Sequence, residues 1–242
     1  MFGSFSHGKI GGEMPKLITL GCSFTALDGL RDKLTELLKY ENIDFSISAG
    51  TNRLQVNKIT EYLLDNHLDS EDILLWQVTY SSRNGIRIGP NTPLSDNVEK
   101  IQKSIFHPLS THYDKNNKNI FDNKHRYDLL QRSPLAKYKD ILLNFDENDQ
   151  LQDLLKTIIM ISKFHKKLLV FFGNDDVLSK ENRKTFEQYL NKHRVEYIPE
   201  SFVTWVFRTR LEFRDKVHPS ADAGMLFAEK VLYQRMVELK WI

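Results

Sequence analysis

The sequence has very little cysteine, no long apolar run and no excess of charge of one sign. Cys22 is the only cysteine among 242 residues, which excludes an internal disulfide and a zinc site built from several thiolates. No apolar run approaches the roughly 20 residues that a membrane-spanning helix needs. The formal net charge is +2, with acidic and basic residues spread along the chain. Neither nucleic acid nor an anionic membrane is therefore an expected partner.

The glycine-rich motifs that bind phosphates are also missing. Neither Gly-x-Gly-x-x-Gly nor Gly-x-x-x-x-Gly-Lys follows the first apolar run, so dinucleotide binding and P-loop phosphate binding are not expected. His107, His112 and His125 lie in a polar region without the ligand spacing of a zinc site. Solvated loop histidines are the simpler interpretation. We therefore expect no organic cofactor and no metal.

The composition is that of one globular unit. Hydrophobic residues make up 40% of the chain and aromatic residues 11%, enough for one substantial core. We expect a single domain over 16–242. Residues 1–15 are rich in Gly and Ser and lack the apolar core of a secretory signal. They are interpreted as a flexible leader or an expression remnant, and the expected location is cytoplasmic.

Short apolar runs alternate with amphipathic segments along most of the chain. Strands are predicted at 17–20, 43–48, 72–78, 168–172 and 195–198, and helices at 26–40, about 54–67, 151–166, 180–192 and 220–239. This alternation indicates a parallel sheet covered on both faces, so the predicted fold class is α/β with three layers. Residues 81–149 break the pattern. We interpret them as an insertion, either a lid or a segment with short helices of its own.

Three polar residues are candidates for chemistry. Ser23 follows the glycine that ends the first strand, in the stretch LGCSFT, and ligands of parallel sheets bind beyond the carboxyl ends of the strands. A serine there is also a common helix N-cap. Asp215 and His218 stand three residues apart before the final helix. A nucleophilic serine needs an imidazole base, and the base needs a carboxylate that fixes its tautomer. Together the three indicate acyl transfer, although an Asp-x-x-His turn alone is more typical of a solvated loop or a helix cap.

Three stretches resemble a known family. LGCSFT, SAGTNRLQ and DKVHPSADAGMLFAEKV are similar to blocks I, II and V of the SGNH hydrolases, also called the GDSL esterase/lipase superfamily. The resemblance implies a flavodoxin-like α/β/α sandwich with a mainly parallel five-stranded sheet. It also implies that Ser23 is the nucleophile, His218 its general base and Asp215 the acid that orients the imidazole. The backbone N–H groups of Ser23 and Gly50 would hold the oxyanion.

Two positions depart from the family pattern. Cys22 stands where aspartate usually precedes the serine, and we interpret it as a packing residue. The third block, Gly-x-Asn-Asp after the third strand, is replaced by LLWQVTYSSR. The family asparagine that donates to the oxyanion is therefore unassigned, and its role could fall to Asn52, Thr79 or Ser81. Arg83, in the same stretch, is a candidate substrate-binding residue. The later GNDD at 173–176 follows the wrong strand for this block and is interpreted as a turn.

The resemblance implies a serine esterase that acts on a small-molecule or carbohydrate ester. The expected acyl group is short, with acetyl as the family-level expectation. Two alternatives remain open: an acyltransferase that passes the acyl group to a sugar hydroxyl, and a scaffold that binds a ligand without turnover. The sequence makes no prediction of the oligomeric state.

Overall fold

The central element is a parallel β-sheet. The computed structural model describes residues 14–26, 29–46, 51–79, 84–87, 106–109, 147–215 and 218–242. The sheet has five strands in the order β2-β1-β3-β6-β7, and every neighbouring pair is parallel. The strands are β1 (Lys16–Leu20), β2 (Glu41–Asp44), β3 (Ile73–Val78), β6 (Leu168–Phe172) and β7 (Glu196–Tyr197). The α/β class and the parallel five-stranded sheet predicted from the sequence are confirmed.

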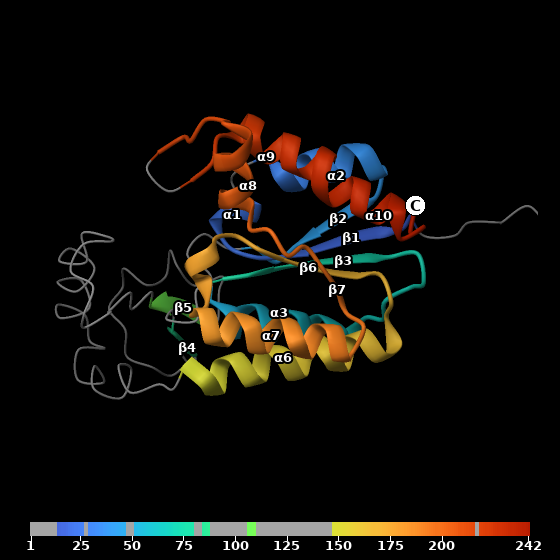
Figure 1. Ribbon diagram of the computed structural model, residues 1–242. Helices are drawn as coiled ribbons and strands as arrows, with labels where there is room; N and C mark the ends of the chain where they lie inside the picture. The colour runs from blue at the N-terminus through green and yellow to red at the C-terminus, as the bar shows by residue number, and fades with distance from the viewer. Residues whose placement is uncertain are drawn as a thin grey trace, which may run out of the picture.

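Helices cover both faces of the sheet, which gives three layers (Figure 1). One layer holds α2 (Leu30–Leu38), α8 (Phe202–Thr209), α9 (Ala221–Phe227) and α10 (Gln234–Glu238), the last two joined by a π-helical segment, Ala228–Tyr233. The other layer holds α3 (Asn52–Asp65), α6 (Glu147–Phe164) and α7 (Lys180–Lys192). Two shorter elements, α1 (Ser23–Ala26) and a 3-10 turn at Asp175–Val177, follow the carboxyl ends of β1 and β6. No helix in the described ranges is both long and apolar enough to span a bilayer.

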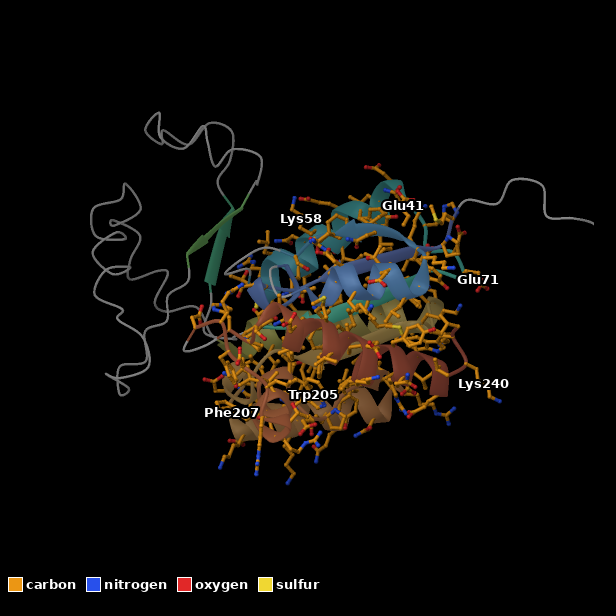
Figure 2. The ribbon with its side chains drawn as sticks, turned by 90° about the horizontal axis from the view of Figure 1, so that it is seen from above. Glu41, Lys58, Glu71, Trp205, Phe207 and Lys240 are labelled. Carbon is orange, nitrogen blue, oxygen red and sulfur yellow. The ribbon has the colours of Figure 1, made fainter. Side chains whose placement is uncertain are left out.

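The inner strands β1, β3 and β6 are largely apolar because both faces of the sheet are buried there. Successive side chains alternate between two clusters of buried residues. Those that pack under α2, α8 and α9 include Leu17, Ile73, Leu75, Leu169 and Phe171. Those that pack under α3, α6 and α7 include Ile18, Leu74, Trp76, Leu168 and Val170. On α8, Trp205 points into the core with 7% of its surface exposed, whereas Phe207 points outward with 68% exposed (Figure 2).

Some element boundaries differ from the prediction. The second strand was predicted at 43–48 and lies at Glu41–Asp44, where its first residues pair with β1 from Lys16 onward. The predicted helix at 26–40 is represented by α1 and α2, with Gly29 in the left-handed region before α2 (φ 69°). Helix α8 was missed altogether. Its residues, FVTWVFRT, are largely β-branched or aromatic and do not favour a helix.

The region predicted as an insertion contains a β-hairpin. Strands β4 (Asn84–Arg87) and β5 (Phe106–Leu109) pair antiparallel, with Asn84 opposite Leu109. The sequence-based interpretation allowed short helices in this region and did not predict these strands. The lid interpretation lies outside the described residues, as does the interpretation of residues 1–13 as a leader. The division into a single domain over 16–242 remains a prediction.

Candidate active site

The strand order places a switch point at the edge where β1 ends. The chain passes from β1 to β2 on one side and from β2 back to β3 on the other side of β1. In open parallel sheets, the crevice beyond the carboxyl ends of the strands at such a point is the usual ligand site. Ser23 begins α1 three residues after β1 ends, and Thr79 follows directly after β3. Both therefore lie at this edge.

Ser23 and His218 are in hydrogen-bond contact although 195 residues separate them in the chain. The Ser23 Oγ lies 2.9 Å from His218 Nε2. Ser23 is 4% exposed, and the imidazole side chain is 27% exposed. A hydroxyl at this distance from an imidazole nitrogen can pass its proton to the ring when the oxygen attacks an electrophile.

Asp215 holds the other side of the imidazole. Its Oδ2 lies 2.9 Å from His218 Nδ1, and its Oδ1 accepts the backbone N–H of His218 at 2.8 Å. The carboxylate thus contacts both the ring and the backbone of the same residue. When Nδ1 carries the proton that faces the carboxylate, Nε2 is left as the acceptor that faces Ser23. The three residues singled out in the sequence are brought together in the order hydroxyl, imidazole, carboxylate.

A short hairpin-like turn presents Asp215 and His218. Phe213 and Pro219 form an isolated antiparallel bridge. Within it, the Arg214 N–H donates to the His218 carbonyl at 2.8 Å. Directly after it, the Ser220 hydroxyl accepts the Ala223 N–H and caps α9. The position of the imidazole is therefore tied to the start of a helix that packs on the sheet.

Aromatic contacts join α1 to this turn. Phe24 follows Ser23 in α1 and lies with its ring centroid 5.3 Å from that of His218. The Phe24 ring also meets Phe202 of α8 edge-on, with the ring centroids 6.2 Å apart. Phe24 is 1% exposed. The buried ring of Phe24 therefore packs against the imidazole of His218.

Asn52 and Thr79, two of the predicted oxyanion residues, bind each other. The Asn52 Nδ2 donates to the Thr79 carbonyl and its Oδ1 accepts the Thr79 N–H, each at 2.9 Å. This pair joins the first residue of α3 to the segment that follows β3. The Thr79 N–H is therefore occupied, whereas the Asn52 amide has a second hydrogen to donate. Their role toward an oxyanion remains a prediction.

The other predicted site residues lie outside the described part of the chain. These residues are Gly50, Ser81 and Arg83. The side chains of His107, His112 and His125, which were interpreted as solvated loop histidines, also lie outside the described part. The GNDD stretch at 173–176 is described, and its interpretation as a turn is confirmed, since Asn174 Oδ1 accepts the Asp175 N–H and caps the 3-10 turn after β6.

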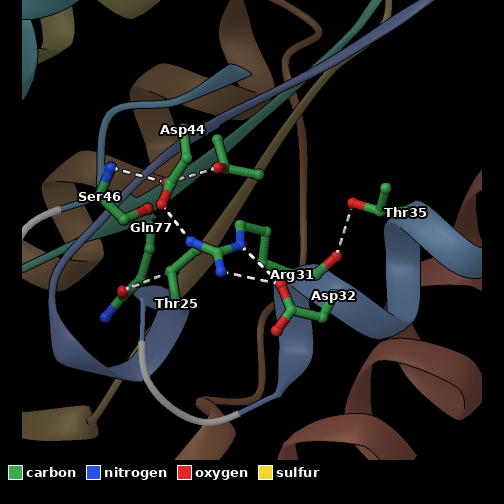
Figure 3. A network of polar contacts seen from close by, with 8 residues as sticks. Thr25, Arg31, Asp32, Thr35, Asp44, Ser46 and Gln77 are labelled. Atoms are coloured by element: carbon green, nitrogen blue, oxygen red, sulfur yellow. Dashed lines mark hydrogen bonds and ion pairs between the residues drawn. The ribbon is translucent and has the colours of Figure 1, made fainter. Parts of the chain in front are cut away.

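A polar network anchors the ends of β1 and β2 beside the site (Figure 3). Asp44, the last residue of β2, accepts the Thr19 hydroxyl and the Ser46 N–H, each at 2.8 Å. Arg31 of α2 donates its guanidinium to the same carboxylate. The network links both strands to α2 near the edge where Ser23 lies.

One residue of the site escaped the sequence analysis. Gln77, near the carboxyl end of β3, is fully buried and hydrogen-bonds to Cys22, directly before Ser23. The available signal was a single polar residue inside the apolar strand ILLWQV. Cys22 itself is buried at 1% exposure, as its interpretation as a packing residue requires.

No protein-family model matches the sequence, and no curated protein matches it. Comparison with solved structures does find similar folds. A member of the lipolytic protein G-D-S-L family from Veillonella parvula DSM 2008 is 14% identical, with a TM-score of 0.50 and coverage of 90% of this chain and 96% of the other. The crystal structure of TesA is 12% identical, with a TM-score of 0.52 and coverage of 93% and 99%. At this level of identity, the likeness shows a shared fold.

Proposed function

We propose that this chain, which has the fold of a lipolytic G-D-S-L family protein, is a serine ester hydrolase. The observation that carries the proposal is the contact of Ser23 Oγ with His218 Nε2 at 2.9 Å, continued by His218 Nδ1 and Asp215 Oδ2 at 2.9 Å. Hydroxyl, imidazole and carboxylate stand in the order that acyl transfer requires. They do so at the sheet edge where α/β proteins bind their ligands.

In the proposed reaction, His218 Nε2 takes the proton of Ser23 as the serine oxygen attacks the carbonyl carbon of the ester. Asp215 stabilises the imidazolium that forms. Collapse of the tetrahedral intermediate breaks the bond to the leaving alcohol, which receives the proton from Nε2. Water then attacks the acyl-enzyme, gives its proton to the same nitrogen, and releases the acid with Ser23 restored.

Two features support hydrolysis rather than transfer to another hydroxyl. Half of the Asp215 side chain and 27% of the His218 side chain are exposed, so water reaches the base that would activate it. Exclusion of water is what favours a competing acceptor. The finer proposal is a short acyl group, acetyl in the first instance, on a carbohydrate or similar polar carrier. It rests on the family resemblance in the sequence.

The oxyanion donors belong to the proposal as well. The backbone N–H groups of Ser23 and Gly50 are the donors implied by the resemblance, and the second amide hydrogen of Asn52 is a further candidate. One such donor typically contributes on the order of 100- to 1000-fold in rate. A substitution of Asn52 would remove both this candidate oxyanion donor and the hydrogen bonds of Asn52 to Thr79.

A fluorophosphonate probe tests the proposal directly, since it phosphonylates an activated serine. We expect labelling of the intact protein, loss of labelling in Ser23→Ala and His218→Ala, and unchanged labelling in Ser70→Ala, which removes an exposed hydroxyl. Hydrolysis of p-nitrophenyl acetate, butyrate and octanoate then ranks acyl length, and acetate release from glucose pentaacetate tests the carrier. Labelling that survives in folded Ser23→Ala would refute the assignment.

A further inference from the structure

Gln77 is a polar side chain where the fold calls for an apolar one. It lies next to last in β3, the middle strand of the sheet, and is fully buried. The preceding side chains on the same face of the strand, Ile73 and Leu75, belong to an apolar cluster. A buried carboxamide is costly unless its oxygen and nitrogen both find partners. Those partners identify what the residue does.

Among the described residues, all the hydrogen bonds of the Gln77 amide go to the segment that carries Ser23. Its Oε1 accepts the Cys22 N–H at 3.0 Å and the Thr25 hydroxyl at 2.7 Å, the latter drawn in Figure 3. Its Nε2 donates to Cys22 Sγ at 3.2 Å. Because a backbone N–H can only donate, the oxygen must face Cys22 N, which fixes the orientation of the amide. Gln77 thus holds the chain on both sides of Ser23.

The two flanking strands leave room for this amide by ending in glycine. A Cβ at Gly21, after β1, would lie 2.4 Å from Thr25 Oγ1 and 2.7 Å from Gln77 Oε1. A Cβ at Gly173, after β6, would lie 2.3 Å from Gln77 Nε2 and 2.9 Å from Phe24 Cδ2. Any larger residue at either position would displace the amide or the turn. The ends of β1, β3 and β6 are therefore packed around one side chain.

We propose that Gln77 is a positioning residue, which fixes the turn from Gly21 to Thr25 so that the Ser23 hydroxyl meets His218 Nε2. This inference rests on the proposed role of Ser23 as the nucleophile. The direction of the Ser23 Cα–Cβ bond follows the backbone of the turn, and the backbone is held at Cys22 N. A displacement of about 1 Å at a reacting atom costs on the order of 100-fold in rate. Phe24, which packs on the imidazole, lies in the same held segment.

A purely structural role for Gln77 predicts something different. In that case, loss of the amide lowers the stability of the protein and leaves the reactivity of Ser23 unchanged in the folded fraction. The chain offers a matched control in Gln55, which is also a buried glutamine, 1% exposed, and whose amide has no hydrogen-bond partner among the described residues. Gln55→Met and Gln77→Met delete the same group from buried positions.

The experiment measures the second-order rate of fluorophosphonate labelling and the kcat and KM for p-nitrophenyl acetate. For folded Gln77→Met we expect labelling and kcat to fall about 10- to 100-fold, with KM within twofold. For Gln55→Met we expect both to stay within twofold of the unmodified protein. Labelling and kcat within twofold in folded Gln77→Met would overturn the inference.

Thr25 provides a second route in case Gln77→Met does not fold. Thr25→Val removes the hydroxyl that Gln77 accepts and keeps the shape, and Thr25→Ser keeps the hydroxyl. We expect about a fivefold loss of labelling rate in Thr25→Val, from one hydrogen bond, and near-normal labelling in Thr25→Ser. Equal rates in the two variants would overturn the inference. If Thr25→Val and Gln77→Met both fold, the double variant is informative as well. Its fold-loss of labelling rate should be smaller than the product of the two single fold-losses, because Thr25 and Gln77 share one hydrogen bond.

Amide hydrogen exchange separates failure of this inference from failure of the proposed function. If the unmodified protein is not labelled and hydrolyses no ester, the proposed function is wrong. The Cys22 N–H then still reports whether Gln77 fixes the turn. Exchange at Cys22 that is slow in the unmodified protein and in Gln55→Met, and at least tenfold faster in Gln77→Met, supports fixation of the turn. Equal exchange in all three overturns it.

Discussion

Replacement of Asp215 by asparagine tests how the carboxylate supports the imidazole. In the structure, one carboxylate oxygen accepts the His218 backbone N–H at 2.8 Å and the other lies 2.9 Å from Nδ1. Asparagine has a single acceptor oxygen. If that oxygen stays with the backbone N–H, the NH2 group faces Nδ1 and favours the tautomer whose proton is on Nε2. That tautomer cannot accept the proton of Ser23.

The expected magnitude follows from the exposure of Asp215. Two unit charges about 4 Å apart interact by about 1 kcal/mol in water and about 4 kcal/mol near a protein surface. Because half of the Asp215 side chain is exposed, we take the lower part of this range, about 1–3 kcal/mol. Each 1.36 kcal/mol is a factor of about ten in rate. We therefore expect Asp215→Asn to lower kcat by about 5- to 150-fold.

The assay is kcat for p-nitrophenyl acetate at low ionic strength, with thermal unfolding measured in parallel. Asp222→Asn is the control, since it removes an exposed carboxylate from the first turn of α9, close in sequence to the site, and should leave kcat within twofold. Ser23→Ala should lose more than Asp215→Asn. If folded Asp215→Asn retains kcat within twofold while Ser23→Ala is inactive, the carboxylate does not act through the imidazole.

Three further predictions concern other buried residues. Cys22→Ala should keep fluorophosphonate labelling at Ser23, because the thiol is buried; loss of labelling in the folded variant would contradict the interpretation of Cys22 as a packing residue. Asn52→Leu should lower the free energy of unfolding by about 1–3 kcal/mol, because two buried hydrogen bonds to Thr79 are lost, and an unchanged urea midpoint would contradict this. Burial lowers the pKa of His165 from its ordinary 6.5, so the unfolded chain binds the proton more readily and the free energy of unfolding should fall as pH drops below 6.5. His165→Asn should weaken that pH dependence in urea titrations between pH 5 and 8, and identical slopes would refute the reasoning.

The sheet could be predicted because parallel strands that are buried on both faces have short, continuous apolar sequences. The runs at 17–20 and 168–172 lie within or coincide with β1 and β6, and the helix predicted at 180–192 has the bounds of α7. The second strand is the instructive exception. Alternation from Ile43 onward suggested a strand to residue 48, but β2 is Glu41–Asp44, a polar stretch on the edge of the sheet. Pairing with β1 decides its limits, and pairing leaves no local pattern in the sequence.

The candidate site was predictable where chemistry imposes a residue type at a fixed spacing. Asp215 and His218 are three residues apart because one turn must present carboxylate and imidazole to each other, and Ser23 follows a strand end. Gln77 has no such spacing. Its partners are Cys22 and Thr25, more than 50 residues away in the chain, and the contact follows only from the packing of β1 against β3. The one sign of this contact in the sequence was a polar residue, Gln77, within the apolar strand ILLWQV.

The Ser23 hydroxyl and the His218 imidazole are separated by 195 residues in the chain, and this separation bears on synthesis and refolding of the protein. Under the proposed function, a nascent chain that has not yet emerged past residue 218 contains the serine but lacks the base, so a shorter N-terminal fragment would have no activity. The onset of ester cleavage during synthesis or refolding would therefore report the docking of the last helical segment onto the sheet. Two fragments produced separately, with the break between Ser23 and His218, would each lack esterase activity and would gain it only when they reassemble.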